Sequence, residues 1–488
     1  MKPNLIVVFP DQMRGQAMGF LGEEPVQTPH LDRFAEESLV LPQAISNMPV
    51  CSPFRAMLMT GKYPLSNKVV GNCNTKYGRA EQNCELQGSD VCWSDVLKEA
   101  GYSLGYIGKW HLDLPHEPYI DCANNNRTYF DRKLNRQVPL AWNEWCPPDR
   151  RHGFDFWYSY GTYDRHTRPM YWSTNAGREE FRYVDQWGPE HEADLAVKYI
   201  RNEEGTYRDP DRPFALVVAP NPPHMPYHLV PDRYRELYEG VDIEGICSKP
   251  SIPRKGSRWG DYYREHILNY YAMVSGVDEQ LGRILSALED ESLQDDTIVL
   301  FTSDHGDCLG THDFQSKSNC HEESVRIPFL LRWPGSIEPR SDDLLMSVPD
   351  IYPTLLDLMG LRDGIRECLE GTSRADAVLT GNGARPSSQL YVYPHPLRLE
   401  YGDRGVRTHR HTMVVNKAPG RPTDQVLLFD NEADPFQMTN IADREPDTVR
   451  TLLEEELVPW LGHTRDPMSI DLDGPRAAAP RGTLGGLA

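Results

Sequence analysis

The chain has 488 residues, of which 39% are hydrophobic, and a formal net charge of −21. This length can bury a large core, and the acidic balance argues against general binding to nucleic acid or to an anionic membrane surface. No apolar run reaches the length of a membrane span, and the opening residues MKPNLIVVFPDQ lack the layout of a signal peptide. We therefore expect a cytoplasmic protein, or a periplasmic or secreted one if a leader has been removed.

Short apolar runs along the first two thirds of the chain predict buried strands, with helical patterns between them. The runs span residues 4–9, 103–108, 214–219, 297–302 and 328–333. Strands that alternate with helices predict an α/β fold with a large, mostly parallel sheet flanked by helices. In such sheets, ligands bind beyond the carboxyl ends of the strands.

A change of pattern divides the chain into two domains and a tail. Residues 1–385 are expected to form the larger α/β domain, with an irregular, aromatic-rich insertion over about 110–190. Residues 386–465 predict a smaller α+β domain with an antiparallel sheet and a closing helix. Residues 466–488 have little to bury and predict a flexible tail.

The segment NMPVCSPFRAMLMTGKYP places a cysteine at the start of a predicted helix. Pro53 suits the first helical turn and Gly61 suits the position after the last one. Cys51 then lies at the amino end, where backbone N–H groups favour negative charge, and Arg55 follows one turn later. The spacing departs from the C-x5-R of cysteine phosphatases but matches C-x-P-x-R-x-x-x-x-T-G completely. A buried structural thiol beside a salt-bridging arginine is the alternative.

Two further motifs directly follow predicted strands and offer metal ligands. Asp11 and Gln12 follow the first strand, and Asp304 and His305 follow the strand at 297–302. Because the carboxyl ends of neighbouring parallel strands meet at one edge of a sheet, these side chains can converge on one ion. The oxygen-rich set favours Ca²⁺, with Mg²⁺ as the alternative.

Cationic side chains and histidines occupy three more stretches of this kind. Lys109 and His111 alternate in YIGKWHLD, so an extended backbone places them on one face. His224 lies between prolines in APNPPHMPYH, where a rigid surface turn is the alternative, and Lys317 lies in HDFQSKSNCHEESVRIP.

Taken together, these motifs resemble the type I, formylglycine-dependent sulfatases of the alkaline-phosphatase-like superfamily, and bacterial carbohydrate sulfatases in particular. The resemblance covers roughly residues 3–335 and again 427–441. It implies that a maturation enzyme converts Cys51 to formylglycine, whose hydrate attacks sulfur. It also implies a Ca²⁺ at Cys51, held by Asp11, Gln12, Asp304 and His305, although the family usually has aspartate at the second position.

The same resemblance implies a role for each remaining motif residue. Arg55 would help to stabilise the alkoxide of the hydrated aldehyde, and Lys109 would hold the sulfate. Lys317 and His224 would neutralise or protonate the departing sugar oxygen. His111 would take a proton from the second hydroxyl, which releases sulfate and regenerates the aldehyde.

The expected substrate is a sulfated oligo- or polysaccharide, with a galactose-type sugar favoured. Four polar residues are candidate contacts with neighbouring hydroxyls or a second sulfate: His166, Arg407, His409 and His411. The alternatives are a phosphonate monoester or phosphodiester hydrolase of the same superfamily, encouraged by Gln12, or a choline- or aryl-sulfatase. The remaining alternative is a non-enzymatic relative that only binds sulfated glycans.

Overall fold

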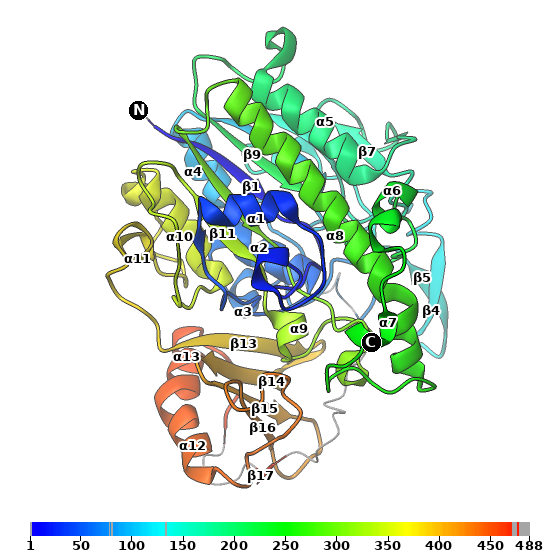
Figure 1. Ribbon diagram of the computed structural model, residues 1–488, viewed down its shortest axis with the longest axis vertical. Coiled ribbons are helices and arrows are strands. Elements are labelled where there is room, and N and C mark those ends of the chain that lie inside the picture. The colour runs from blue at the N-terminus through cyan, green and yellow to red at the C-terminus, as the bar shows by residue number, and fades with distance from the viewer. Residues whose placement is uncertain (1, 78, 80–81, 132–133, 471–475, 478–488) are drawn as a thin grey trace.

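The structure, a computed structural model, contains a large mixed sheet and a smaller antiparallel sheet (Figure 1). It describes residues 2–77, 79, 82–131, 134–470 and 476–477. The expected flexible tail at 466–488 therefore falls largely outside the described residues.

Ten strands form the large sheet in the order β12-β2-β11-β10-β1-β9-β3-β6-β7-β8. At its centre, β10, β1, β9, β3 and β6 run parallel, and the antiparallel pairs lie toward the two edges. The central strands are β1 (Asn4–Val8), β3 (Ser103–Lys109), β6 (Phe156–Tyr160), β9 (Phe214–Ala219) and β10 (Thr297–Thr302). The others are β2 (Leu39–Val40), β7 (Met170–Ser173), β8 (Arg182–Tyr183), β11 (Phe329–Arg332) and β12 (Arg340–Ser341). The predicted mostly parallel sheet is confirmed.

The two faces of the sheet bury separate apolar layers, because successive side chains of a strand point to opposite sides. On β1, Leu5 and Val7 pack with helices α2, α4 and α10, whereas Ile6 and Val8 pack with α1, α5 and α8. Figure 1 shows the long α8 crossing the sheet beside α1 and α5. These helices are α1 (Pro29–Glu36), α2 (Cys51–Thr60), α4 (Trp93–Glu99), α5 (Gly188–Arg201), α8 (Arg258–Asp290) and α10 (Val348–Leu358).

Several shorter helices lie in the connections between strands. They are α3 (Pro64–Asn67), α6 (Asp232–Arg235), α7 (Ile243–Ile246), α9 (Glu322–Val325), α11 (Ala375–Thr380), α12 (Pro446–Thr451) and α13 (Val458–His463). Within the described ranges, no helix combines the length and apolar character that a bilayer span requires.

The segment at 110–190 contributes to the large sheet and is not only an irregular insertion. β6 pairs with β3 in parallel, and β7 and β8 extend the sheet beyond it. The aromatic residues explain this arrangement, because Trp157 of β6 stacks on Tyr106 of β3 with ring centroids 5.2 Å apart. Only the hairpin of β4 (Arg127–Asp131) and β5 (Arg136–Leu140) forms a separate sheet.

The C-terminal sheet lies at one end of the molecule (Figure 1). Its antiparallel strands are β13 (Ser388–His395), β14 (Arg398–Thr408), β15 (His411–Lys417) and β16 (Gln425–Asp430), and β17 (Arg476–Ala477) pairs with β16. Leu390, Val406 and Leu428 of this sheet belong to the same apolar layer as α2 and α10. The smaller domain therefore shares a core with the larger one.

Candidate active site

The predicted motif residues meet at the carboxyl ends of four neighbouring strands. Asp11 follows β1, Lys109 ends β3, His224 follows β9 and Asp304 follows β10. The order β10-β1-β9-β3 places these strand ends side by side, as the α/β pattern predicts. Cys51 reaches the same place as the first residue of α2.

Four ligating side chains form the centre of the site. One donor atom from each of Asp11, Cys51, Asp304 and His305 lies within 4.8 Å of the others, and all four residues are buried. The sulfur of Cys51 is 3.3 Å from Nε2 of His305 and 3.7 Å from Oδ1 of Asp11. The structure therefore brings together the predicted nucleophile and three of the predicted metal ligands.

The carboxyl groups of Asp11 and Asp304 lie close together in a buried space, so that the charge of one disfavours ionisation of the other. Burial and the neighbouring Asp11 raise the pKa of Asp304 to about 8. Burial alone would raise the pKa of Asp11 as well, but Lys109 and other nearby cations hold it well below its usual value. Arg55 donates to both carboxylates, at 3.2 and 3.4 Å, and Lys109 lies 2.6 Å from Asp11. Two buried carboxylates that share a site in this way are well suited to a divalent cation.

Gln12 presents its amide oxygen to the same space, and its surroundings explain why an amide stands here. Its Nε2 donates to Oδ2 of the buried Asp307 at 2.8 Å and to Tyr227 at 3.2 Å. The amide orientation is thereby fixed, and Oε1 accepts a bond from Lys317 at 2.7 Å. A carboxylate at position 12 would face Asp307 without a donor between them. The donor set of Gln12 with Asp11, Asp304 and His305 fits a hard cation such as Ca²⁺.

Lys317 joins the site from the loop that precedes α9. Its Nζ lies 3.5 Å from the sulfur of Cys51.

Burial and the nearby carboxylate of Asp11 raise the pKa of Cys51 to about 11, so the helix amino end does not make this thiol a thiolate at neutral pH. The unmodified side chain is consequently a poor nucleophile.

The two histidines predicted to be catalytic differ in exposure, because His111 is buried and the side chain of His224 is 14% exposed. Burial and the cations Lys317 and Lys109 hold the pKa of His224 well below its usual value, and burial with Lys109 and Arg55 does the same for His111. His111 has a positive φ of 53°, and both its ring nitrogens are buried and lack a partner among the described residues. Among the described residues, both ring nitrogens of His111 are therefore free to hydrogen-bond a ligand.

The four predicted saccharide contacts lie elsewhere. His166 is buried, and its Nε2 lies 2.8 Å from the backbone oxygen of His224, so it positions that residue. Arg407 pairs with Glu322, and with His409 it lines a cavity of about 660 Å³ that does not include Cys51 or its neighbours. His411 lines neither this cavity nor the one described next.

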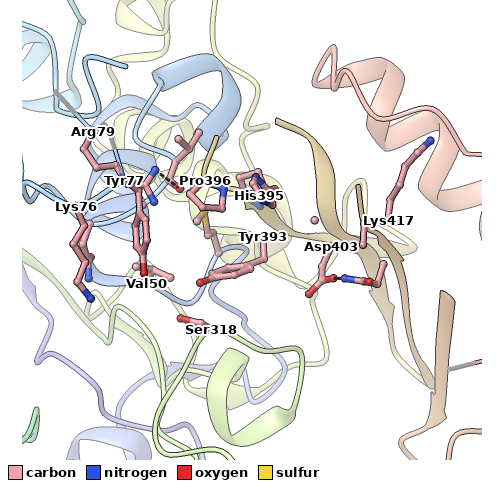
Figure 2. A pocket seen from close by; sticks show the side chains of 18 of the residues that line it. Val50, Lys76, Tyr77, Arg79, Ser318, Tyr393, His395, Pro396, Asp403 and Lys417 are labelled. Carbon is pink, nitrogen blue, oxygen red and sulfur yellow. Dashed lines mark hydrogen bonds between the residues drawn. The ribbon is translucent and has the colours of Figure 1, made fainter. Parts of the chain in front are cut away.

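A second cavity, of about 320 Å³, lies between the two domains and is here called the interdomain cavity (Figure 2). Its walls include Val50 and Ser318, the chain neighbours of Cys51 and Lys317. Trp142 also lines it and packs on the His111 ring, with centroids 6.3 Å apart. The sequence analysis missed this cavity, although the adjacent Lys76 and Tyr77 offered a local signal of a cation and an aromatic ring.

Comparisons with known proteins agree with this geometry. The sulfatase family model matches residues 3–361, and the model of the N-sulphoglucosamine sulphohydrolase C-terminal region matches residues 310–460. An endo-4-O-sulfatase of Bacteroides thetaiotaomicron is 37% identical over 95% of this chain and 93% of its own length. An ulvan-active sulfatase of Formosa agariphila is 29% identical over 93% of this chain and 80% of its own length.

Solved structures give the same result. The Bacteroides fragilis protein yidJ is 49% identical, with a TM-score of 0.89 over 96% of this chain and 97% of that one. The structure BT33494S-sulf of Bacteroides thetaiotaomicron, from work on glycosaminoglycan metabolism, is 35% identical and has a TM-score of 0.85. The match covers 96% of this chain and 97% of that one. The matched residues include every strand end that carries a motif, and the chain therefore belongs to the sulfatase family and is a sulfuric ester hydrolase.

Proposed function

We propose that this sulfatase removes an O-sulfate group from a sulfated oligo- or polysaccharide, with a galactose-type sugar favoured. The interdomain cavity carries the proposal, because it opens beside Cys51 and Lys317 and is large enough for a sugar unit. Its wall combines aromatic rings with hydroxyl, amide and charged groups, a mixture that suits sugars better than simple aryl groups. The relatives named as endo-4-O-sulfatase and ulvan-active sulfatase support the same substrate class.

The modified residue and the metal would supply the chemistry that the unmodified chain lacks. Formylglycine at position 51, made by a maturation enzyme, would supply a hydrated aldehyde as the nucleophile. A Ca²⁺ held by Asp11, Gln12, Asp304 and His305 would supply fixed positive charge beside it, and Mg²⁺ is the alternative.

The chain's own residues would complete the reaction. Arg55 and Lys109 place positive charge at the carboxyl ends of the strands, where the sulfate would lie. Lys317 and His224 would face the departing sugar oxygen, and His224 is held in place by the backbone contact to His166. His111, neutral because its pKa is lowered by burial and nearby cations, can accept the proton whose removal releases sulfate.

A substrate screen tests the proposal. Protein in which mass spectrometry confirms the aldehyde would be assayed on defined sulfated saccharides, on nitrophenyl sulfate, and on matched phosphonate monoesters and phosphodiesters. We expect the highest kcat/KM on a sulfated saccharide. A higher kcat/KM on the aryl sulfate would contradict the carbohydrate assignment, and preferred turnover of the phosphorus esters would favour the alternative suggested by Gln12.

A further inference from the structure

The interdomain cavity has a positive wall in a strongly acidic protein. Four lysine or arginine residues line it, against one carboxylate, whereas the chain as a whole has a net charge of −21. The cations are Lys76, Arg79, Lys417 and Arg421, and the carboxylate is that of Asp403. Asp403 accepts a bond from Asn416, and burial raises its pKa to about 6. This single carboxylate can offset the charge of only one of the four cations.

Among the described residues, none of the four cations forms an ion pair. Arg79 donates to the backbone oxygen of Val70 at 3.3 Å, and Arg421 donates to the amide oxygen of Asn416 at 2.7 Å. Lys417 donates to the backbone oxygen of Ser469 at 2.6 Å. Within the part of the chain that the structure describes, the ammonium of Lys76 lies over the ring of Tyr77, 5.6 Å from its centroid. Cations that outnumber the carboxylates around them are expected where a ligand supplies further negative charge.

Three hydroxyl groups line the cavity near Lys76. Figure 2 shows the hydroxyl groups of Tyr77, Tyr393 and Ser318 directed into one space beside Lys76, while Lys417 extends away from it. Ser318 directly follows Lys317, whose Nζ contacts Cys51. Tyr77 has a positive φ of 58°, a strained conformation that is more common at binding sites than elsewhere. These four side chains form a polar pocket next to the position of the sugar that loses its sulfate.

We propose that this pocket binds a second anionic group of the substrate, a carboxylate or a further sulfate on the neighbouring sugar, with Lys76 as its main contact. The hydroxyl groups of Tyr77, Ser318 and Tyr393 would donate hydrogen bonds to the same group or to adjacent sugar hydroxyls. The inference rests on the carbohydrate sulfatase activity proposed above. It replaces Arg407, His409 and His411 as the expected site for a second anion.

The test compares matched substrates with two lysine variants. The substrates are a uronate-containing saccharide hydrolysed in the screen, its carboxyl-reduced counterpart, that counterpart with a second sulfate, and nitrophenyl sulfate. We expect Lys76→Met to lower kcat/KM on the uronate-containing saccharide by about 10- to 100-fold, the loss of one charge-assisted hydrogen bond. Activity on the carboxyl-reduced saccharide and on nitrophenyl sulfate should be unchanged. Lys417→Met is the comparison, because its ammonium contacts Ser469, and it should lower kcat/KM on the uronate-containing saccharide much less than Lys76→Met does.

The remaining arms identify the anion and can overturn the inference. If the second sulfate restores the wild-type kcat/KM that carboxyl reduction has lowered, the pocket accepts either anion. If it does not, the pocket is specific for a carboxylate. Equal wild-type activity with and without the second anion would overturn the inference, as would an equal loss in both lysine variants or a preferred substrate with a single anionic group. In each of these cases the enzyme still removes sulfate from the saccharide. Failure of the proposed function would instead be seen as no saccharide turnover, so the two failures can be told apart.

Discussion

Replacing Arg407 by methionine should destabilise the protein without weakening substrate binding. Arg407 of β14 forms a two-point pair with Glu322, at 3.0 and 3.3 Å, and also contacts Gln43 at 2.7 Å. The exposed fractions of the two charged side chains are 7% and 11%. Removing one partner of a buried pair leaves the other charge uncompensated and costs about 3–5 kcal/mol, and the slight exposure here places the expected loss near about 3 kcal/mol. Replacing both partners, as Arg407→Met with Glu322→Leu, should recover most of that loss.

Denaturant unfolding and saccharide kinetics on the same variants check this expectation. The control is Arg410→Met, which removes a 57% exposed side chain from its pair with Asp430 and should lower the unfolding midpoint much less than Arg407→Met does. At a temperature where all variants are folded, KM for the saccharide should stay within about twofold of wild type. An unchanged unfolding midpoint together with a raised KM would refute the reasoning and make Arg407 a substrate contact.

Four further outcomes follow from the site and its surroundings. Cys51→Ala should abolish turnover but keep the unfolding midpoint, and residual hydrolysis near the wild-type rate would remove Cys51 as the nucleophile. Complete chelation should lower both activity and the unfolding midpoint, because Asp11 and Asp304 then share a buried space without the ion. Ca²⁺ should restore both better than Mg²⁺ does. Activity of metal-free protein, verified by elemental analysis, would contradict the proposed metal site. Burial raises the pKa of Glu192 from 4.5 to about 8, so between these pH values the native state holds a proton that the unfolded state has lost. The free energy of unfolding therefore falls as the pH rises from 4.5 to about 8. The thermal midpoint of Glu192→Gln should exceed that of the wild type above about pH 8 and equal it near pH 4. His166→Phe should lower kcat on a sugar sulfate more than it changes KM, because we propose that His224 assists departure of the sugar, and it should lower kcat less on nitrophenyl sulfate. Equal losses on both substrates would argue against a positioning role.

Local sequence was sufficient wherever a strand and its following motif are contiguous. The runs that became β1, β3, β9 and β10 are predominantly apolar, and each ends at or just before its polar motif, so both the sheet and its active edge could be predicted. The strand β6 was missed because its sequence FWYSY lacks the aliphatic run of the other central strands. Its pairing depends on stacking with Tyr106, which no local pattern reveals.

Contacts between distant segments account for the rest. Arg407 and His409 are a polar cluster on a hairpin, and sequence gives no sign that Glu322, 85 positions away, neutralises the first of them. The interdomain cavity forms where residues 71–79 meet residues 393–421, and each segment alone resembles an ordinary loop or strand. The substitution of Gln12 could be noticed in the sequence, but its reason, the buried Asp307 behind it, required the fold.

The burial of Cys51 has a consequence for the order of events during protein synthesis. Its side chain is 1% exposed and lies between loops whose residues come from positions 11 and 304–317, far apart along the polypeptide. An oxidising enzyme could not reach this sulfur once the last of those loops has been translated and has packed against it. The proposed conversion of residue 51 would therefore have to take place on the nascent or still unfolded chain, and a cell that folds the protein first would accumulate a stable but inert product.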